Sequence, residues 1–111
     1  MTKRDNEFSY IQADLLEKFM VDVFCQLGVK QEDARICADV LISADRYGIE
    51  SHGINRFKNK YYDQIRAGIR SVKTEINVIK DRPVIGIIDA QGGLGHVAGK
   101  KAMRMAIEKA Q

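Results

Sequence analysis

Apolar residues recur at helical spacing through the first half of the chain. One broad stripe predicts a helix from about Gln12 to Leu27, and its members are Leu15, Leu16, Phe19, Met20, Val23, Phe24 and Leu27. A second stripe predicts a helix from Gln31 to Tyr47, and its members are Ile36, Cys37, Val40, Leu41 and Ala44. Gly28 and Gly48 follow these stripes as stop signals. Because the link between the two helices is short, we expect them to pack antiparallel around a shared core.

A third helix is predicted to begin at Ser51 or Gly53 and to end before Gly68. At about 100° per residue, four apolar residues gather on one side of it: Ile54, Phe57, Tyr61 and Ile65. Four ionisable residues gather on roughly the opposite side: His52, Arg56, Lys60 and Asp63. The apolar side anchors the helix in the core. The ionisable side either meets solvent or lines a cleft, and periodicity alone does not choose between the two.

After Gly68 the pattern changes to that of strands. Residues 75–79 alternate between polar and apolar, which predicts a half-buried strand, and residues 80–83 are typical of a turn. The apolar run from Val84 to Asp89 predicts a strand covered on both faces. A glycine-rich link precedes a fourth helix, whose stripe is Ala98, Ala102, Met103, Ala106, Ile107 and Ala110.

These elements predict a mixed α/β fold in two parts. Residues 1–70 form a helical N-terminal region with three helices, and residues 71–111 form the start of a mixed β-sheet domain with two strands and a helix. Two strands cannot cover the run from Val84 to Ile88 on both faces. We therefore expect the sheet domain to be truncated and the chain to be the N-terminal piece of a longer protein.

The composition is that of an ordinary globular protein. The 111 residues are 45% hydrophobic and 30% charged, and the net charge of +3 does not by itself require an anionic polymer as partner. Cys25 and Cys37 lie within apolar helical patterns, so we expect reduced core thiols in a cytoplasmic protein. No apolar run approaches the ~18 residues of a membrane span. No clustered Cys, His and Asp spacing predicts a metal site.

Candidate chemistry gathers where Ser51, His52 and Gly53 are followed by Arg56. We expect Ser51 to cap the third helix, since its hydroxyl can satisfy a free backbone N–H. His52 and Arg56 stand four residues apart and should project side by side. A neutral imidazole can move a proton near pH 7, and a guanidinium can bind a carboxylate through two parallel hydrogen bonds. The pair therefore suits a small organic acid whose neighbouring carbon is oxidised or reduced.

The sequence around this histidine resembles a known family. Residues 44–53 (ADRYGIESHG), Arg56 and Gly68, with residues 88–96 (IDAQGGLGH) and 102–110 (AMRMAIEKA), are similar to the malate/L-lactate dehydrogenase family. That family also contains sulfolactate, ureidoglycolate and diketogulonate oxidoreductases, and it is distinct from the lactate and malate dehydrogenases with a Rossmann fold. The resemblance covers most of residues 12–111 and only the N-terminal third of the family's usual length.

The resemblance implies an oxidoreductase that uses NAD or NADP to interconvert 2-hydroxy acids and 2-oxo acids, usually as a homodimer. It implies that His52 is an active-site proton carrier, that Arg56 binds the substrate carboxylate and that Ser51 is a polar neighbour of the site. Many members carry a tyrosine four residues after the arginine, where this chain has Lys60 followed by two tyrosines. That departure puts a substrate contact from this turn in doubt.

A further catalytic histidine and most nicotinamide contacts belong to parts of the family beyond residue 111. Cofactor-binding residues are therefore not assigned here, and we expect the 111 residues alone to be inactive. The link Gly92–Gly95 follows a strand and opens a helix, as phosphate-binding loops do. It lacks the full Gly-x-Gly-x-x-Gly spacing, so we interpret it as a structural turn, with His96 as a capping or packing residue.

A different class of function is a stand-alone helical binding module, for example for nucleic acid. Its support is a run that mixes cations with aromatic residues, namely Arg56, Lys58, Lys60, Tyr61, Tyr62, Arg66, Arg70 and Lys73. Asp63 interrupts this run and the net charge is small, so we prefer the oxidoreductase, with neither nucleic acid nor membrane as partner. A purely structural fragment is the third alternative.

Overall fold

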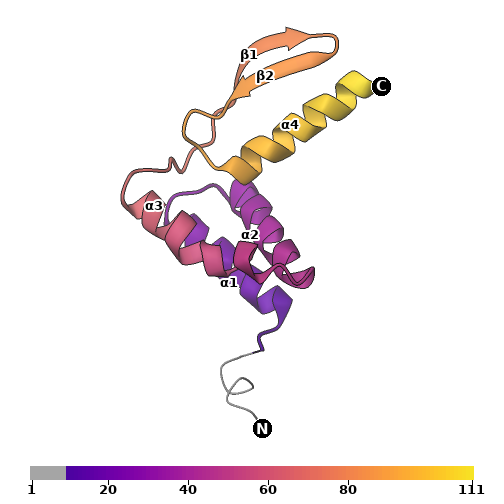
Figure 1. Cartoon of the computed structure of the whole chain (residues 1–111). Helices are drawn as coiled ribbons and strands as arrows, with labels where there is room; N and C mark the ends of the chain where they lie inside the picture. Colours follow the sequence, from indigo (N-terminus) through magenta and orange to yellow (C-terminus); the bar gives the residue numbers. More distant parts are fainter. Residues whose placement is uncertain (1–9) are drawn as a thin grey trace.

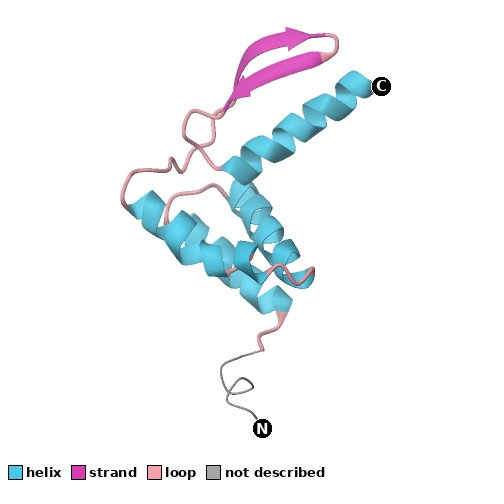
Figure 2. Ribbon diagram, viewed as in Figure 1, coloured by secondary structure: helices cyan, strands magenta, loops and turns pink. Residues whose placement is uncertain are grey.

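The computed structural model describes residues 10–111, and Figure 1 shows the order of the elements along the chain. The elements are α1 (Ala13–Gln26), α2 (Gln31–Arg46), the 3₁₀ turn η2 (Glu50–His52), the π-helical segment η3 (Phe57–Tyr62), α3 (Asp63–Arg66), β1 (Asn77–Arg82), β2 (Ile85–Asp89) and α4 (Gly95–Ala110). The helices of the first half pack together, and the hairpin and α4 extend away from them (Figure 2). The predicted mixed α/β class is confirmed. The division at residue 70 stays a prediction.

The first two helices form the base of the core, and their predicted bounds are correct to within one residue. Met20 and Phe24 of α1 are fully buried against α2. The α1 stripe is nevertheless wider than the surface that is covered, because Leu15 and Phe19 are 62% and 53% exposed. Aromatic rings continue the core into the third helical segment, since the ring of Phe24 lies 5.2 Å from that of Phe57 in an edge-on arrangement.

The third helix does not begin where periodicity placed it. Ser51 and His52 belong to the short turn η2, and helical structure resumes only at Asn55. The backbone of Gly53, with φ −93° and ψ −138°, lies outside helical geometry and separates the two segments. The predicted apolar side is correct, because Phe57 and Tyr61 are buried and two flanking isoleucines pack against the core.

The two strands form an antiparallel hairpin whose turn is Pro83–Val84, shorter than predicted. The prediction that Val84–Asp89 is covered on both faces is wrong for this chain. Val84, Ile85 and Ile87 are 93%, 51% and 43% exposed, because within the described residues only α4 lies beside the hairpin.

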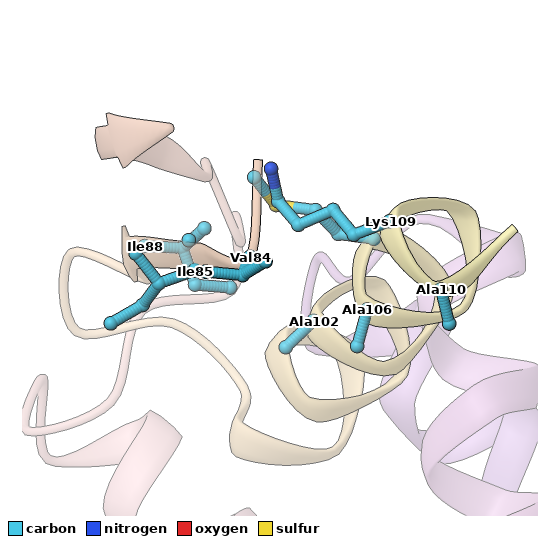
Figure 3. A pocket seen from close by; sticks show the side chains of 9 residues that line it. Val84, Ile85, Ile88, Ala102, Ala106, Lys109 and Ala110 are labelled. Atoms are coloured by element: carbon cyan, nitrogen blue, oxygen red, sulfur yellow. The ribbon is translucent and has the colours of Figure 1, made fainter. Parts of the chain in front are cut away.

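An apolar cavity of about 400 Å³ separates the hairpin from α4 (Figure 3). Its lining comes from β2 and the preceding turn on one side and from α4 on the other: Val84, Ile85, Gly86, Ile88, Ala102, Met105, Ala106, Lys109 and Ala110. Lys109 joins the two sides by an ion pair with Asp81 and by a 2.6 Å hydrogen bond to the carbonyl oxygen of Arg82. In α4, Val97 is fully buried, whereas Met103 and Ile107 of the predicted stripe are 62% and 52% exposed.

Among residues 10–111, no helix combines the length and the apolar character needed to cross a bilayer. Both cysteines are free thiols, but the prediction that both lie in the core is wrong for Cys25, which is exposed. Cys37 is fully buried. The pKa of Cys37 is raised to about 12, chiefly by burial and also by the nearby Asp33, while Arg70 opposes the shift.

The two cysteines should differ sharply in reactivity, since the thiolate is the attacking form. At pH 8 a thiol with a pKa of about 12 is ionised in roughly one molecule in ten thousand. We expect iodoacetamide to label Cys25 in the native chain and to label Cys37 only after denaturation, as read by intact mass and peptide mapping. Equal native labelling of both thiols would contradict the buried position of Cys37.

Candidate functional site

Ser51, His52 and Arg56 form one connected group at the start of the third helical segment. The Ser51 hydroxyl lies 2.8 Å from Nδ1 of His52, so it does not cap a helix as predicted. Arg56 donates from Nε to the Ser51 carbonyl oxygen at 2.9 Å, and its Nη2 lies 3.4 Å from His52 Nε2. The predicted pairing of the imidazole with the guanidinium is therefore present.

These contacts define the state of the His52 ring. A guanidinium has only donors, so Nε2 must present its lone pair toward Arg56. In the neutral ring Nδ1 then carries the hydrogen and donates it to the Ser51 hydroxyl. The nitrogen that faces the guanidinium is thus the one able to accept a proton.

A carboxylate from α2 fixes the turn that carries this group. Asp45 accepts a 2.9 Å hydrogen bond from the backbone N–H of Ile54. A Cβ at Gly53 would lie only 2.0 Å from Oδ1 of Asp45, so the carboxylate occupies the space in which any other residue would place its side chain. Sequence reasoning quoted Asp45 only as part of a motif, and no local pattern assigns it this contact.

The π-helical geometry of η3 changes the identity of the residue that lies one helical turn after Arg56. Hydrogen bonds in a π-helix join residues five apart rather than four. Arg56 is the residue immediately before η3, so Tyr61 rather than Lys60 completes the turn that begins there. The π-helical spacing therefore links the backbone of Arg56 to that of Tyr61, one residue further along than an α-helix would.

Tyr61 stands in a partly buried polar cluster. Its hydroxyl lies 2.9 Å from Nε2 of His96, its ring lies 5.9 Å from that of Phe24, and the guanidinium of Arg70 lies 5.0 Å from its ring centre. Burial raises the pKa of Tyr61 and Cys37 raises it further, whereas Arg70 and Arg56 oppose the shift. The sequence interpretation of His96 as a packing residue did not include this contact.

Ser51, His52 and Arg56 form an open surface rather than a closed pocket, and we call this surface the wall of the site. His52 and Ser51 are exposed and Arg56 is partly buried. Four cavities in the described residues are lined by other segments. Of the two alternatives that periodicity left open, the ionisable side of this segment meets solvent in this chain. A ligand held here would touch protein on one side only.

The glycine-rich link does not offer a free phosphate cradle. A Cβ at Gly93 would lie 2.8 Å from the Cα of Thr74, so this glycine permits close packing of two backbone segments. The N–H of Leu94, at the start of α4, already donates to the Thr74 hydroxyl at 2.9 Å. These residues do not fit a dinucleotide, and within residues 10–111 no group of His, Cys, Asp and Glu side chains is arranged to hold a metal ion.

Solved structures that share this arrangement include two malate dehydrogenases. Malate dehydrogenase from Entamoeba histolytica superposes with a TM-score of 0.89 and 37% identity, over 92% of this chain and 28% of that one. Malate dehydrogenase from Pyrococcus horikoshii superposes with a TM-score of 0.85 and 41% identity, over 93% of this chain and 31% of that one. The fold is therefore that of the N-terminal part of such enzymes.

The sequence matches the same group of proteins. Malate dehydrogenase of Pyrococcus abyssi is 44% identical over 107 residues, which are 96% of this chain and 29% of that protein. L-sulfolactate dehydrogenase of Methanocaldococcus jannaschii is 44% identical over 95 residues, which are 86% of this chain and 27% of that protein. The profile of the malate/L-lactate dehydrogenase family matches residues 11–111, and the chain belongs to this family. It spans less than a third of the length of these relatives.

Replacing Gly53 by alanine should destabilise the site turn. The new Cβ would displace Asp45 and break its bond to Ile54, at a cost of about 1–3 kcal/mol, as for other overpacked positions. Gly99→Ala is the matched control, because nothing lies within 4 Å of a Cβ there and alanine favours a helix. Urea unfolding of both variants measures the difference. Equal stability of G53A and the parent chain would contradict the contact.

Acid should weaken the fold through His96. Burial lowers the pKa of His96 below its ordinary value of 6.5, and Arg70 lowers it further. In mild acid the unfolded chain therefore binds a proton at His96 more readily than the folded chain does. The stability that the neutral His96 gives to the folded chain is complete above pH 6.5 and is lost as the pH falls. We expect His96→Gln to lose less stability than the parent between about pH 7.5 and 5.5 in urea unfolding. Equal losses would show that His96 does not contribute.

Proposed function

We propose that this chain provides the proton-transfer and carboxylate-binding wall of an enzyme that interconverts a 2-hydroxy acid and a 2-oxo acid with NAD or NADP. The observation that carries the proposal is the contact between the imidazole of His52 and the guanidinium of Arg56. Family membership and the names of the relatives support the reaction class. The substrate would be a small acid, such as the malate or sulfolactate in those names.

Arg56 would bind the substrate carboxylate. Its Nε is held by the Ser51 carbonyl oxygen, so the guanidinium plane is fixed before a ligand arrives. A carboxylate would take over the Nη2 hydrogen bond that now points to His52. Pre-organisation of this kind removes part of the entropic cost of binding.

His52 would transfer the proton. With Arg56 turned to the carboxylate, Nε2 of the neutral ring would accept the proton of the substrate hydroxyl. Ser51 would hold Nδ1–H and so keep the other nitrogen available. A nicotinamide cofactor supplies the hydride acceptor in this chemistry, and the described residues do not hold it. In the reverse direction a protonated His52 would deliver its proton to the carbonyl oxygen.

Tyr61 would be the third group of the wall. The charge of Arg56 is among the causes that act on the pKa of Tyr61, so the two side chains belong to the same electrostatic neighbourhood. The wall is open, so the proposal requires further protein, from the same polypeptide or from a second subunit of the expected homodimer, to cover a bound acid.

The direct test is turnover by the protein expressed from its full reading frame. NADH and NADPH are each supplied with pyruvate, oxaloacetate, 2-oxoglutarate and sulfopyruvate, and oxidation is followed at the nicotinamide absorbance. We expect turnover of at least one of these acids, whereas the isolated 111 residues should show none. Absence of turnover across the panel would reject the function, and turnover by the isolated chain would contradict the expected inactivity.

Two substitutions in that full-length protein should separate the proposed roles. His52→Ala removes the proton carrier and should lower kcat by roughly 10²–10⁴-fold. Arg56→Lys keeps the charge but loses the planar fork, so it should raise KM by roughly 10-fold or more and change kcat less. Lys58→Ala is the control, because Lys58 pairs with Asp63 at the surface. Parental kinetics in both site variants would reject the assignments.

A further inference from the structure

The contact between Tyr61 and His96 joins two parts of the chain that are 35 residues apart. It connects the π-helical segment η3 with the first turn of α4. The neighbouring Leu94 and Val97 are fully buried, so the start of α4 is firmly seated on the helices. No step of the proposed reaction uses His96.

The π-helical segment depends on such outside contacts. A π-turn has fewer favourable internal interactions than an α-turn, and it persists where tertiary contacts hold it. Phe57 is held at one end by edge-on contacts with the rings of Phe24 and Phe19. Tyr61 is held at the other end by Phe24, by Arg70 and by the His96 ring.

Two registers compete at this point of the chain. With α-helical spacing, Lys60 would follow Arg56 by one turn, and with π-helical spacing Tyr61 takes that place. Lys60 is exposed, so a change of register would not cost it any contact with the core. In the observed π register the hydroxyl of Tyr61 has a specific partner, because it lies 2.9 Å from Nε2 of His96.

We propose that His96 is a positioning residue that selects the π register, so that Tyr61 and not Lys60 follows Arg56 beside the proposed carboxylate site. His96 acts through the Tyr61 hydroxyl and does not itself touch the acid. The inference rests on the proposed function only for the role given to Arg56. Its structural content concerns the backbone between residues 56 and 62.

The groups that face His96 come from several elements. Tyr61 approaches from η3, and Arg70 comes from the segment after α3. Arg70 is itself held by bonds from Nε and Nη2 to Oε1 of Gln64, at 3.2 and 2.8 Å. The fixed cation and the partial burial both favour the neutral ring, which can accept the hydrogen of the Tyr61 hydroxyl.

The test is solution NMR of the 111-residue chain. A contact between the α-proton of Arg56 and the amide proton of Tyr61 reports the π register, and the exchange rates of amides 57–62 report its stability. In His96→Leu we expect the contact to be lost and those amides to exchange roughly fivefold faster, the factor expected for one lost hydrogen bond. Amides of α1 and α2 should keep their parental protection.

Two further variants separate positioning from general packing. His96→Gln keeps a side-chain acceptor within reach of the hydroxyl and should restore the π contact. Tyr61→Phe removes only the hydroxyl and should reproduce the loss, even if leucine at position 96 prevents folding. Tyr62→Phe is the matched control, since the Tyr62 hydroxyl bonds Arg66 and not α4.

Persistence of the π contact in Tyr61→Phe would overturn the inference. So would failure of His96→Gln to restore the contact that His96→Leu loses. The measurement uses neither substrate nor cofactor, so its result does not depend on whether the full-length protein turns over a 2-oxo acid. Conversely, failed turnover with an intact register would reject the proposed function alone.

Discussion

The carboxylate of Asp45 lying against Gly53 is the contact on which the local geometry of the site depends. It accepts a hydrogen bond from the backbone N–H of Ile54 and occupies the space beside Gly53. The chain therefore does not continue as a helix from η2 into η3. His52 is thereby left in a turn just before the helical segment rather than inside it. The arginine four residues later can then turn back and bond the Ser51 carbonyl oxygen.

Aromatic rings connect the hydrophobic core to the segment that carries this site. Phe24 of α1 contacts both Phe57 and Tyr61, with ring centres 5.2 and 5.9 Å apart. The Tyr61 ring serves the core, while its hydroxyl belongs to the polar cluster with His96. Side chains with an apolar body and a polar tip suit such a boundary. The rings that pack the helical core therefore also hold the side chains of the site segment in place.

Periodicity predicted the parts of the fold that are set by local sequence. The first two helices repeat their apolar stripes and stop before Gly28 and Gly48, and the structure places their ends within one residue of the predicted Leu27 and Tyr47. The pairing of His52 with Arg56 was also visible, because a spacing of four brings side chains together in most helical geometries. What these features share is that neighbours in the sequence decide them.

Longer-range contacts account for what the sequence did not reveal. The start of the third helix is set by Asp45, and the π register of η3 accompanies the contact of Tyr61 with α4. Cys25 was predicted to lie in the core yet is exposed, and it stands outside the apolar stripe of α1. The strand run of the hairpin is exposed because in the described residues one helix covers it rather than two layers.

Several cations of the run between Arg56 and Lys73 are engaged with neighbouring side chains. Lys58 is paired with Asp63, and Arg66 bonds the Tyr62 hydroxyl. Arg70 is bound to Gln64 and stacked over Tyr61. A polyanion is held by many mobile charges that can each meet a phosphate; Lys58, Arg66 and Arg70 instead contact their own neighbours, whereas Lys60 and Lys73 are exposed. Arg56 differs because its Nε is fixed while Nη2 makes only a long contact. A directional donor of this kind suits one carboxylate at one position.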